Sequence, residues 1–244
     1  MRSKRKIPKE YNRWYRSGDR HLTKKQRKKK KAEKLRNKKL VKQYYWLAPR
    51  EYTWGKPYIG RLEDWYDYSY IMWGWGKGWD KAFGKIYMEE LGAAVKEAGQ
   101  KDFSILETKE KYNEARLYCG GTTEKVHDII RKYEVISGHI CYYCGKEAPA
   151  IYDGYLLARC FDCYCKQVRR GEKWVKDPNY TPMTDEEILE EYNERIDDVP
   201  DENGEYHLPD KYKLTSFKDG ETIEEIIDIS DTTTEIRKWW NKHH

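Results

Sequence analysis

Four cysteines arranged as two Cys-x-x-Cys pairs are the residues of this chain whose type and spacing best suit chemistry. The pairs are Cys141/Cys144 and Cys160/Cys163, with fifteen residues between them. This spacing lets two thiolates bind one metal ion from a tight turn, and four thiolates match the tetrahedral coordination of Zn²⁺. The sequence therefore predicts a structural Zn²⁺ site at these four residues. Four unrelated core thiols, or two disulfides, stay open as alternatives.

A zinc ion held by four thiolates has no open position for water or substrate, so it stabilises a fold and does not catalyse. Enzymes with similar cysteine spacing need further residues. His-Asn-His nucleases need a His beside the pairs, but residues 145–159 contain none. Zinc deaminases need a His-x-Glu motif, and phosphate-binding loops need a Gly-rich stretch before Lys-Ser/Thr; the chain has neither motif. We expect a protein without enzymatic activity.

The elements predicted around the two pairs would bring the four thiolates together. Gly145 follows the first pair directly, where a zinc knuckle needs a residue that tolerates positive φ. Asp153-Gly154 is a favoured two-residue turn and predicts a short hairpin of residues 150–152 and 156–158. Residues 161–169 lack Gly and Pro, and predict a helix whose first turn carries the second pair. A knuckle, a hairpin and a ligand-bearing helix are typical of a treble-clef zinc module.

The remaining patterns predict an α+β fold in which helices flank this module. Apolar residues at intervals of three and four predict helices over residues 80–98 and from Thr122 or Thr123 to about residue 136. Two strands are expected at 103–108 and 115–119. Because aliphatic residues are few while Tyr (22) and Trp (10) are abundant, we expect a core built largely from aromatic rings. A capping box at Thr184 predicts a further helix with Ile188, Leu189, Tyr192 and Ile196 on one side. After it we expect an extended or hairpin segment over 205–220 and a last helix capped at 232–234.

Charge is divided unevenly along the 244 residues, and the net charge of +6 describes neither end. Residues 1–42 hold 20 Lys/Arg and three acidic residues, a net of +17, whereas residues 185–235 hold 19 Asp/Glu and four Lys/Arg, a net of −15. We therefore predict four parts: a basic arm over 1–43, an aromatic-rich irregular segment over 44–79, an α+β zinc-binding module over 80–170, and an acidic helical or extended C-terminal region over 171–244.

The basic arm is the predicted nucleic-acid-binding element. Its charges repel one another, so alone it should be disordered or only partly helical, becoming helical on binding. Against phosphates it would neutralise charge and release counterions, which gives salt-sensitive, sequence-blind binding. The candidate residues combine cations with one stacking ring, and are Trp14, Lys24, Lys25, Arg27, Lys28, Lys29, Lys30, Lys31, Lys34, Arg36, Lys38 and Lys39. An acidic protein surface, including this chain's own C-terminal region, is the alternative target.

Nine Tyr and Trp residues lie between Tyr44 and Tyr68, interrupted by Pro and Gly. Such rings can stack on bases, pack against the zinc module, or dock on a partner, because Trp and Tyr dominate interface hot spots. The sequence does not decide whether this segment faces inward or outward.

Three motifs follow one another in the central region: Gly76-Lys77-Gly78-Trp79, the tract KEKYNEARLY at 109–118, and Cys141-Tyr142-Tyr143-Cys144-Gly145. Over about residues 73–168 the chain resembles a family of small phage- and prophage-encoded proteins, in which Gly-Asp-Gly-Trp, Lys-Glu-Lys-Phe-Gly-Gly-Leu-Arg-Phe-Tyr and a zinc knuckle recur in this order. Lys77 replaces the acid of that family, Asn113-Glu114 replace its Gly pair, and Cys163 stands where a His often supplies the fourth ligand. The resemblance implies a phage or prophage origin and a zinc-bearing α+β module, and it carries over no activity.

Together these observations favour a non-enzymatic, zinc-stabilised phage-type protein that engages RNA, DNA or a ribonucleoprotein through its basic arm. The alternative is a phage protein that docks on a host or virion assembly, such as a polymerase, ribosome, defence complex or capsid, through its aromatic surface and acidic tail. No apolar run approaches the ~18–20 residues that span a bilayer, so we expect no membrane partner. The host cytoplasm is the expected location, with virion association as a further option.

Overall fold

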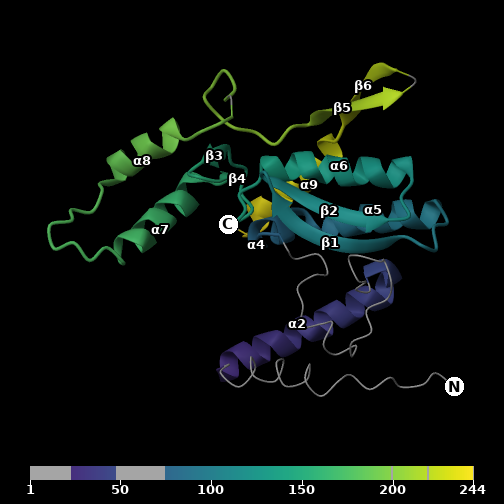
Figure 1. Ribbon diagram of the computed structural model, residues 1–244, viewed down its shortest axis with the longest axis horizontal. Coiled ribbons are helices and arrows are strands. Elements are labelled where there is room, and N and C mark those ends of the chain that lie inside the picture. The colour runs from purple at the N-terminus through teal and green to yellow at the C-terminus, as the bar shows by residue number, and fades with distance from the viewer. Residues whose placement is uncertain (1–22, 48–74, 199, 219, 244) are drawn as a thin grey trace.

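The computed structural model describes residues 23–47, 75–198, 200–218 and 220–243 (Figure 1). Helices and three small antiparallel sheets alternate along this part of the chain, which is therefore α+β. None of the helices described is long and apolar enough to span a bilayer. The elements in chain order are α2 (Lys24–Gln43), η1 (Tyr45–Leu47), α4 (Lys77–Trp79), the π-helical turn η2 (Asp80–Gly84), α5 (Lys85–Glu97), β1 (Ser104–Lys111), β2 (Glu114–Gly120), α6 (Glu124–Gly138), β3 (Ala150–Tyr152), β4 (Leu156–Ala158), α7 (Phe161–Glu172), α8 (Asp185–Glu194), β5 (Lys211–Lys218), β6 (Glu221–Asp228) and α9 (Ser230–His243).

The main core lies where α5 and α6 pack together and α6 packs on strand β2 of the β1–β2 hairpin. Both helices were predicted from their apolar periodicity, and Thr123 caps α6 as expected by accepting a hydrogen bond from the backbone of Val126. Aromatic rings fill this core. Tyr87 stacks on Tyr133 with ring centroids 4.1 Å apart, and Trp75 stacks on the other side of Tyr87 at 5.4 Å. The expectation of an aromatic core is confirmed.

The two ends of the aromatic-rich segment face inward. Trp46 and Leu47 in η1, Trp75 just before α4 and Trp79 at the end of α4 are all buried in the main core. Packing is therefore the role of these rings, whereas Tyr45 beside them is half exposed. Residues 48–74 lie outside the part of the chain that the structure describes.

Residues 24–43 of the basic arm form one continuous helix, α2, which exceeds the partial helix expected for the arm alone. Lys, Arg, Gln, Ala and Leu are all good helix formers, so propensity favours this helix although its charges repel. Its C-terminal end is also anchored, because Val41 and Tyr44 pack against the main core just before η1. Residues 1–22, with Trp14, lie outside the described residues.

Part of the predicted acidic C-terminal region, residues 171–244, packs into the main core. Leu208, Tyr212, Ile229 and Ile236 are buried in the same core as α5 and α6. Strand β5 lies along α6, where the Arg131 guanidinium donates to the Thr215 carbonyl at 3.0 Å. Acidic side chains cover the outer surface of this region, but its apolar side completes the main core.

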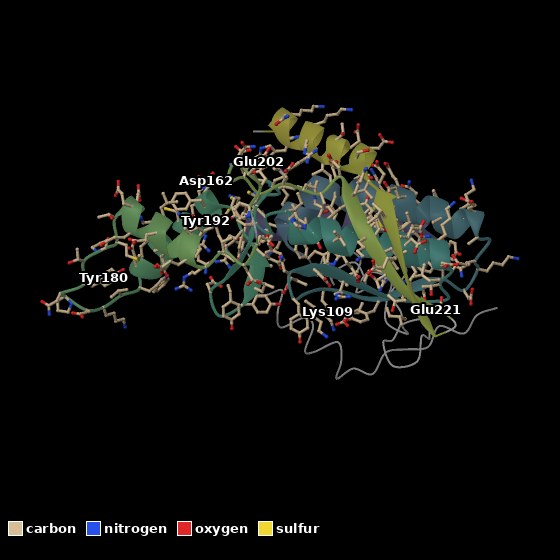
Figure 2. The ribbon with its side chains drawn as sticks, turned by 90° about the horizontal axis from the view of Figure 1, so that it is seen from above. Lys109, Asp162, Tyr180, Tyr192, Glu202 and Glu221 are labelled. Atoms are coloured by element: carbon tan, nitrogen blue, oxygen red, sulfur yellow. The ribbon has the colours of Figure 1, made fainter. Side chains whose placement is uncertain are left out.

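A second, smaller core joins the hairpin β3–β4 to the antiparallel helices α7 and α8. It consists of Ile151, Tyr164, Ile188 and Tyr192. The capping box predicted at Thr184 is present, whereas Leu189 is 44% exposed and does not share the apolar side as expected. In Figure 1 this helix pair extends away from the main core, and in Figure 2 Tyr180 marks its far end.

The last helix begins earlier than predicted. Helix α9 starts at Ser230 and places Thr232 and Thr233 in its first turns instead of at its cap. The Thr233 hydroxyl donates to the Asp210 carboxylate at 2.6 Å, which joins α9 to the start of β5. This contact spans 23 residues of sequence, so local capping preferences could not reveal it.

Truncating a C-terminal core residue should destabilise the whole main core, because this region is part of it. Leu208 is 1% exposed, so Leu208→Ala should lower the free energy of unfolding by about 2–5 kcal/mol. Leu189→Ala is the matched control, since Leu189 is 44% exposed and its loss should cost less than about 0.5 kcal/mol. Urea denaturation followed by tryptophan fluorescence measures both. Equal costs would show that residues 205–243 do not stabilise the core.

Candidate metal centre

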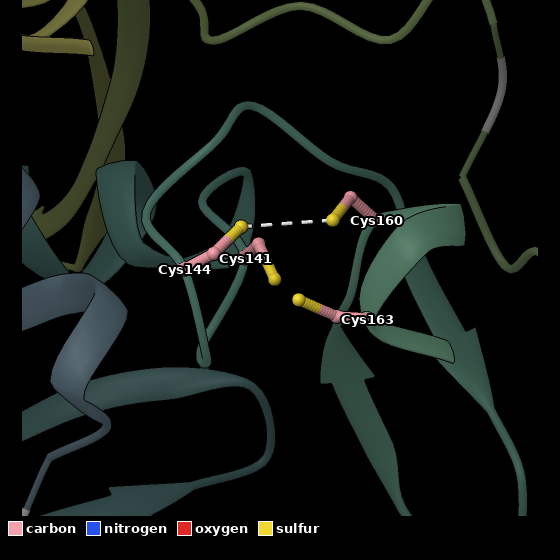
Figure 3. A group of neighbouring side chains, drawn as sticks. All are labelled: Cys141, Cys144, Cys160 and Cys163. Carbon is pink, nitrogen blue, oxygen red and sulfur yellow. Dashed lines mark hydrogen bonds between the residues drawn. The ribbon is translucent and has the colours of Figure 1, made fainter. Parts of the chain in front are cut away.

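The side chains of Cys141, Cys144, Cys160 and Cys163 point toward one another, and their four sulfur atoms all lie within 4.8 Å of one another (Figure 3). All six cysteines of the chain are free, and the Sγ atoms of Cys144 and Cys160 are 3.6 Å apart, much longer than the roughly 2.05 Å of a disulfide bond. The predicted ligand set is thus brought together as one cluster, and the alternative of two disulfides is wrong.

The cluster has the size that a tetrahedral metal site needs. Metal–sulfur bonds of about 2.3 Å place neighbouring sulfurs of a tetrahedron about 3.8 Å apart. The distance of 3.6 Å between the Sγ atoms of Cys144 and Cys160 and the upper limit of 4.8 Å for the group bracket this value. Cys141 and Cys160 are buried, while Cys144 and Cys163 are partly exposed. Four soft donors in this arrangement could hold one divalent metal ion.

The first cysteine pair sits on a tight backbone turn. The Cys141 amide donates to the Lys146 carbonyl at 2.7 Å, and the Gly145 amide donates to the Cys141 carbonyl at 2.9 Å. Gly145 has φ of +89°, the left-handed conformation that the sequence predicted for this position. The turn directs both thiols of the pair to the same side.

The second pair sits at the start of α7. Cys160 is the N-cap of this helix, and its carbonyl accepts the amides of Cys163 and Tyr164, both at 3.0 Å. The first helical turn therefore places Cys160 and Cys163 on one side. The predicted hairpin is also present, with β3 paired to β4 and Gly154 at φ +90° in its turn.

The four thiols shift one another's pKa values in opposite directions. Hydrogen bonds from Cys144 and Cys160 lower the pKa of Cys141, and the same bonds raise the pKa of both donors. Burial raises the pKa of the Cys163 thiol to about 12. The cluster by itself thus favours one thiolate among four sulfurs. A bound metal ion would reverse this balance, because its charge stabilises every thiolate that coordinates it.

Arg159 is a functional neighbour that sequence reasoning missed. It is 3% exposed, directly precedes Cys160, and forms an ion pair with Asp153 at 2.6 Å. Its guanidinium also lies over the ring of Tyr143, 5.4 Å from the centroid, and its carbonyl accepts the Tyr192 hydroxyl at 2.8 Å. These contacts hold the second pair against the first knuckle and against α8. The only sequence signal was a cation at the end of an apolar strand.

The motif Gly76-Lys77-Gly78-Trp79 packs against the backbone of the first knuckle. The Gly78 amide donates to the Tyr142 carbonyl at 2.9 Å, and the Trp79 indole donates to the Ile140 carbonyl at 2.7 Å. A Cβ atom at Gly78 would lie 2.2 Å from the Cys141 carbonyl oxygen. Only glycine permits this approach, so the two glycines are explained by packing. Lys77, which replaces the acid of the resembled family, is exposed.

Asn113, another departure from that family, ties the β1–β2 turn to the cysteine hairpin. Its φ is +66°, which Asn tolerates better than most residues, while Tyr112 before it also has a positive φ of +53°. The Asn113 side chain accepts the Ala158 amide and donates to the Gly138 carbonyl at 3.0 Å. A Gly at this position would allow the turn but would provide neither hydrogen bond.

The other candidate ligands lie elsewhere. Cys165 packs in the second core, and Cys119 lines a cavity of about 580 Å³ between β2, α6 and β5, where burial raises its pKa to about 11. His139, two residues before Cys141, does not join the cluster, and burial lowers its pKa. His127 is exposed on α6.

The predicted nucleic-acid-binding cations all lie on α2, apart from Trp14, which is outside the described residues. This helix carries twelve Lys/Arg and one Glu over 20 residues and makes its main contacts with η1. In Figure 1 it lies below the β1–β2 sheet, away from the rest of the main core. The side chains described as exposed are Lys24, Lys25, Arg27, Lys28, Lys31 and Lys39, whereas those of Lys29, Lys30, Lys34, Arg36 and Lys38 are not among the side chains that the structure describes.

Comparison with protein-family models, with curated proteins and with solved structures finds no match for this chain. The resemblance to phage-encoded zinc-knuckle proteins therefore remains a hypothesis based on the motifs alone. Among the described residues, the four-cysteine cluster is the group of side chains that could hold a metal ion.

Removing one ligand should abolish stoichiometric metal binding. We expect Cys163→Ser to lose the metal ion, since three thiolates and a hydroxyl bind soft divalent ions far more weakly. Cys165→Ser is the matched control, because Cys165 lies in the second core and not in the cluster. Native mass spectrometry should find one ion per chain in the intact protein and in the control. Retention of the ion by the Cys163 variant would contradict the assignment of ligands.

A methyl group at Gly78 should displace the knuckle and destabilise the protein. The clash with the Cys141 carbonyl oxygen should cost about 1–3 kcal/mol or more and speed loss of metal to a chelator. Gly171→Ala is the control, because no atom lies within 4 Å of the added Cβ in α7, and it should stabilise by about 0.5–1 kcal/mol. If both variants unfold at the same urea concentration, the close contact is unimportant.

Proposed function

We propose that this protein is a non-enzymatic, zinc-stabilised binding protein of phage type, which acts in the host cytoplasm and engages nucleic acid or a ribonucleoprotein through helix α2. The observation that carries the proposal is the density of exposed cations on a helix that projects from the folded body. Twelve of the 20 residues of α2 are Lys or Arg, and the cations whose side chains the structure describes are all exposed.

Zn²⁺ is the metal that we assign to the four cysteines. All four donors are cysteine sulfurs, which as thiolates are the soft ligands that select zinc, and their spacing suits a closed tetrahedral site. The knuckle at 141–145, the hairpin β3–β4 and the start of α7 supply the ligands, so we interpret this part as a treble-clef-like module. In such a module the zinc ion replaces apolar core, and the second core has only four buried residues.

Helix α2 would supply affinity without reading sequence. An α-helix of 20 residues is about 30 Å long, which lets its lysines and arginines contact several phosphates at once. Each neutralised phosphate releases counterions, and this release drives binding at low salt. The anchor at Val41 and Tyr44 fixes the direction in which the helix leaves the body.

A protein partner is the second candidate, favoured by the acidic outer side of α8. Glu186, Glu187, Glu190 and Glu194 are exposed there, and could face a basic surface of a host or virion assembly. The aromatic contribution to this alternative is smaller than the sequence suggested, because the rings at both described ends of the 44–79 segment are mostly buried.

Neutralising five exposed cations of α2 tests the proposal. The variant Lys24→Gln, Lys25→Gln, Arg27→Gln, Lys28→Gln and Lys31→Gln should bind RNA and DNA weakly at low salt. The slope of log K against log salt should become shallower by about 3.5, given about 0.7 per single-strand phosphate contact. Fluorescence anisotropy with labelled oligonucleotides at several salt concentrations measures this slope.

The control removes five exposed cations from the folded body, as Gln variants of Lys81, Lys96, Lys101, Lys211 and Lys242. This control should keep most of the affinity and slope. Equal losses in both variants would show that total charge, and not α2, decides binding. A partner from bacterial lysate that stays bound after nuclease treatment, with no oligonucleotide affinity, would favour the protein-docking alternative.

A further inference from the structure

Helix α7 carries a row of exposed cations that the metal cluster does not use. Lys166, Arg170 and Lys173 follow one another at intervals of four and three residues, so they share one face and extend over about 10 Å of helix axis. All three side chains are exposed, and no carboxylate among the described residues forms an ion pair with them. Arg169 differs, because it pairs with Glu172 and Asp185.

An exposed indole continues this row. Trp174 is 79% exposed and is followed by Val175 and Lys176, which are also exposed. An indole this exposed offers a flat apolar face on which a ligand can stack. We call Lys166, Arg170 and Lys173 together with Trp174 the α7 surface.

The loop that bears Trp174 is held in place by its own hydrogen bonds. The Trp174 amide donates to the Gly171 carbonyl at 2.9 Å, and Glu172 accepts the Met183 amide at 2.9 Å and the Tyr180 hydroxyl at 3.3 Å. These contacts close the loop between α7 and α8, whose far end is marked by Tyr180 in Figure 2. Ordering this loop in advance lowers the entropy that a ligand would otherwise lose on binding.

We propose that the α7 surface binds single-stranded nucleic acid, with phosphates on its cations and an unpaired base stacked on Trp174. The inference rests on the proposed function and specifies its ligand, since α2 alone would not distinguish single strands from duplexes. Stacking on an indole requires an exposed base face, which a duplex interior does not offer. The positive charge beside the ring matches the negative charge beside each base.

Two other ligands fit less well. A membrane surface would need a continuous apolar face, but the apolar face of α7, with Tyr164 and Val168, packs in the second core. An acidic peptide would satisfy the cations, yet it gives Trp174 no stacking partner. The α7 surface combines charge and a flat ring within a few residues, which is the combination that single strands require.

The test compares single-stranded and duplex oligonucleotides of one sequence in the full-length, metal-loaded protein. Trp174→Ala should weaken binding of the single strand about 5- to 150-fold, which corresponds to about 1–3 kcal/mol for one stacked base. Duplex binding and the salt slope should stay unchanged. Trp174→Phe should recover most of the single-strand affinity, because it keeps an aromatic face.

Charge is tested separately from stacking. The triple variant Lys166→Gln, Arg170→Gln and Lys173→Gln should lower the single-strand salt slope by about 2, given about 0.7 per phosphate contact. Its matched control is the triple Gln variant of Lys81, Lys96 and Lys101, which are exposed elsewhere and should leave the slope nearly unchanged. Circular dichroism confirms that all variants stay folded.

The outcomes separate this inference from the proposed function. If Trp174→Ala binds single strands as tightly as the intact protein while the α2 variant loses binding, the inference is wrong and the role of α2 stands. If the Trp174 variant loses single-strand affinity and the α2 variant does not, the α7 surface stands and the role of α2 fails. Equal losses for single strands and duplexes, or loss only toward vesicles of anionic phospholipid, would also overturn the inference.

Discussion

A backbone-to-backbone contact between Gly78 and the cysteine knuckle joins the main core of this protein to the four-cysteine cluster. The Gly78 amide donates to the Tyr142 carbonyl, and the absence of a Cβ at Gly78 lets the two backbone segments approach closely. The knuckle glycine, Gly145, faces the same place, since a Cβ there would lie 2.8 Å from the Gly78 carbonyl oxygen. Helix α5 and its aromatic core lie on one side of this contact, and the four cysteines lie on the other.

The cysteine cluster links the knuckle to α7 and, through the second core, to α8. The second core contains four buried residues, too few to hold a helical hairpin without further support. A metal ion at the cluster would bind α7 through Cys160 and Cys163 and the knuckle through Cys141 and Cys144. Arg159 adds a buried ion pair and two ring contacts at the same junction. The position of the α7 surface relative to the body is therefore set at the metal centre.

Local patterns predicted what local interactions determine. The Cys-x-x-Cys spacing, the Asp153-Gly154 turn and the caps at Thr123 and Thr184 each act within a few residues, and all four are present. Contacts between distant residues were missed. Leu208 enters the main core, and Asn113 bonds to Ala158 across 45 residues of sequence, but nothing near either residue indicates its partner. Leu189 fits the apolar period of α8 yet is exposed. Periodicity shows which face of a helix is apolar, but it does not show how much of that face packs against other elements.

The basic residues near the N-terminus and the acidic residues near the C-terminus lie on different sides of the protein. In Figure 1, α2 lies below the β1–β2 sheet, whereas α8 and the β5–β6 hairpin, which carry much of the acidic charge, lie on the opposite side. Attraction between the two ends would favour folding α2 back onto these elements, but burial of Trp46 and Leu47 fixes where the helix leaves the body. Screening by salt weakens charge attraction over more than about 8–10 Å, while it leaves buried apolar contacts intact. The cations of α2 thus stay available to an external polyanion because apolar packing, and not charge, decides the direction of the helix.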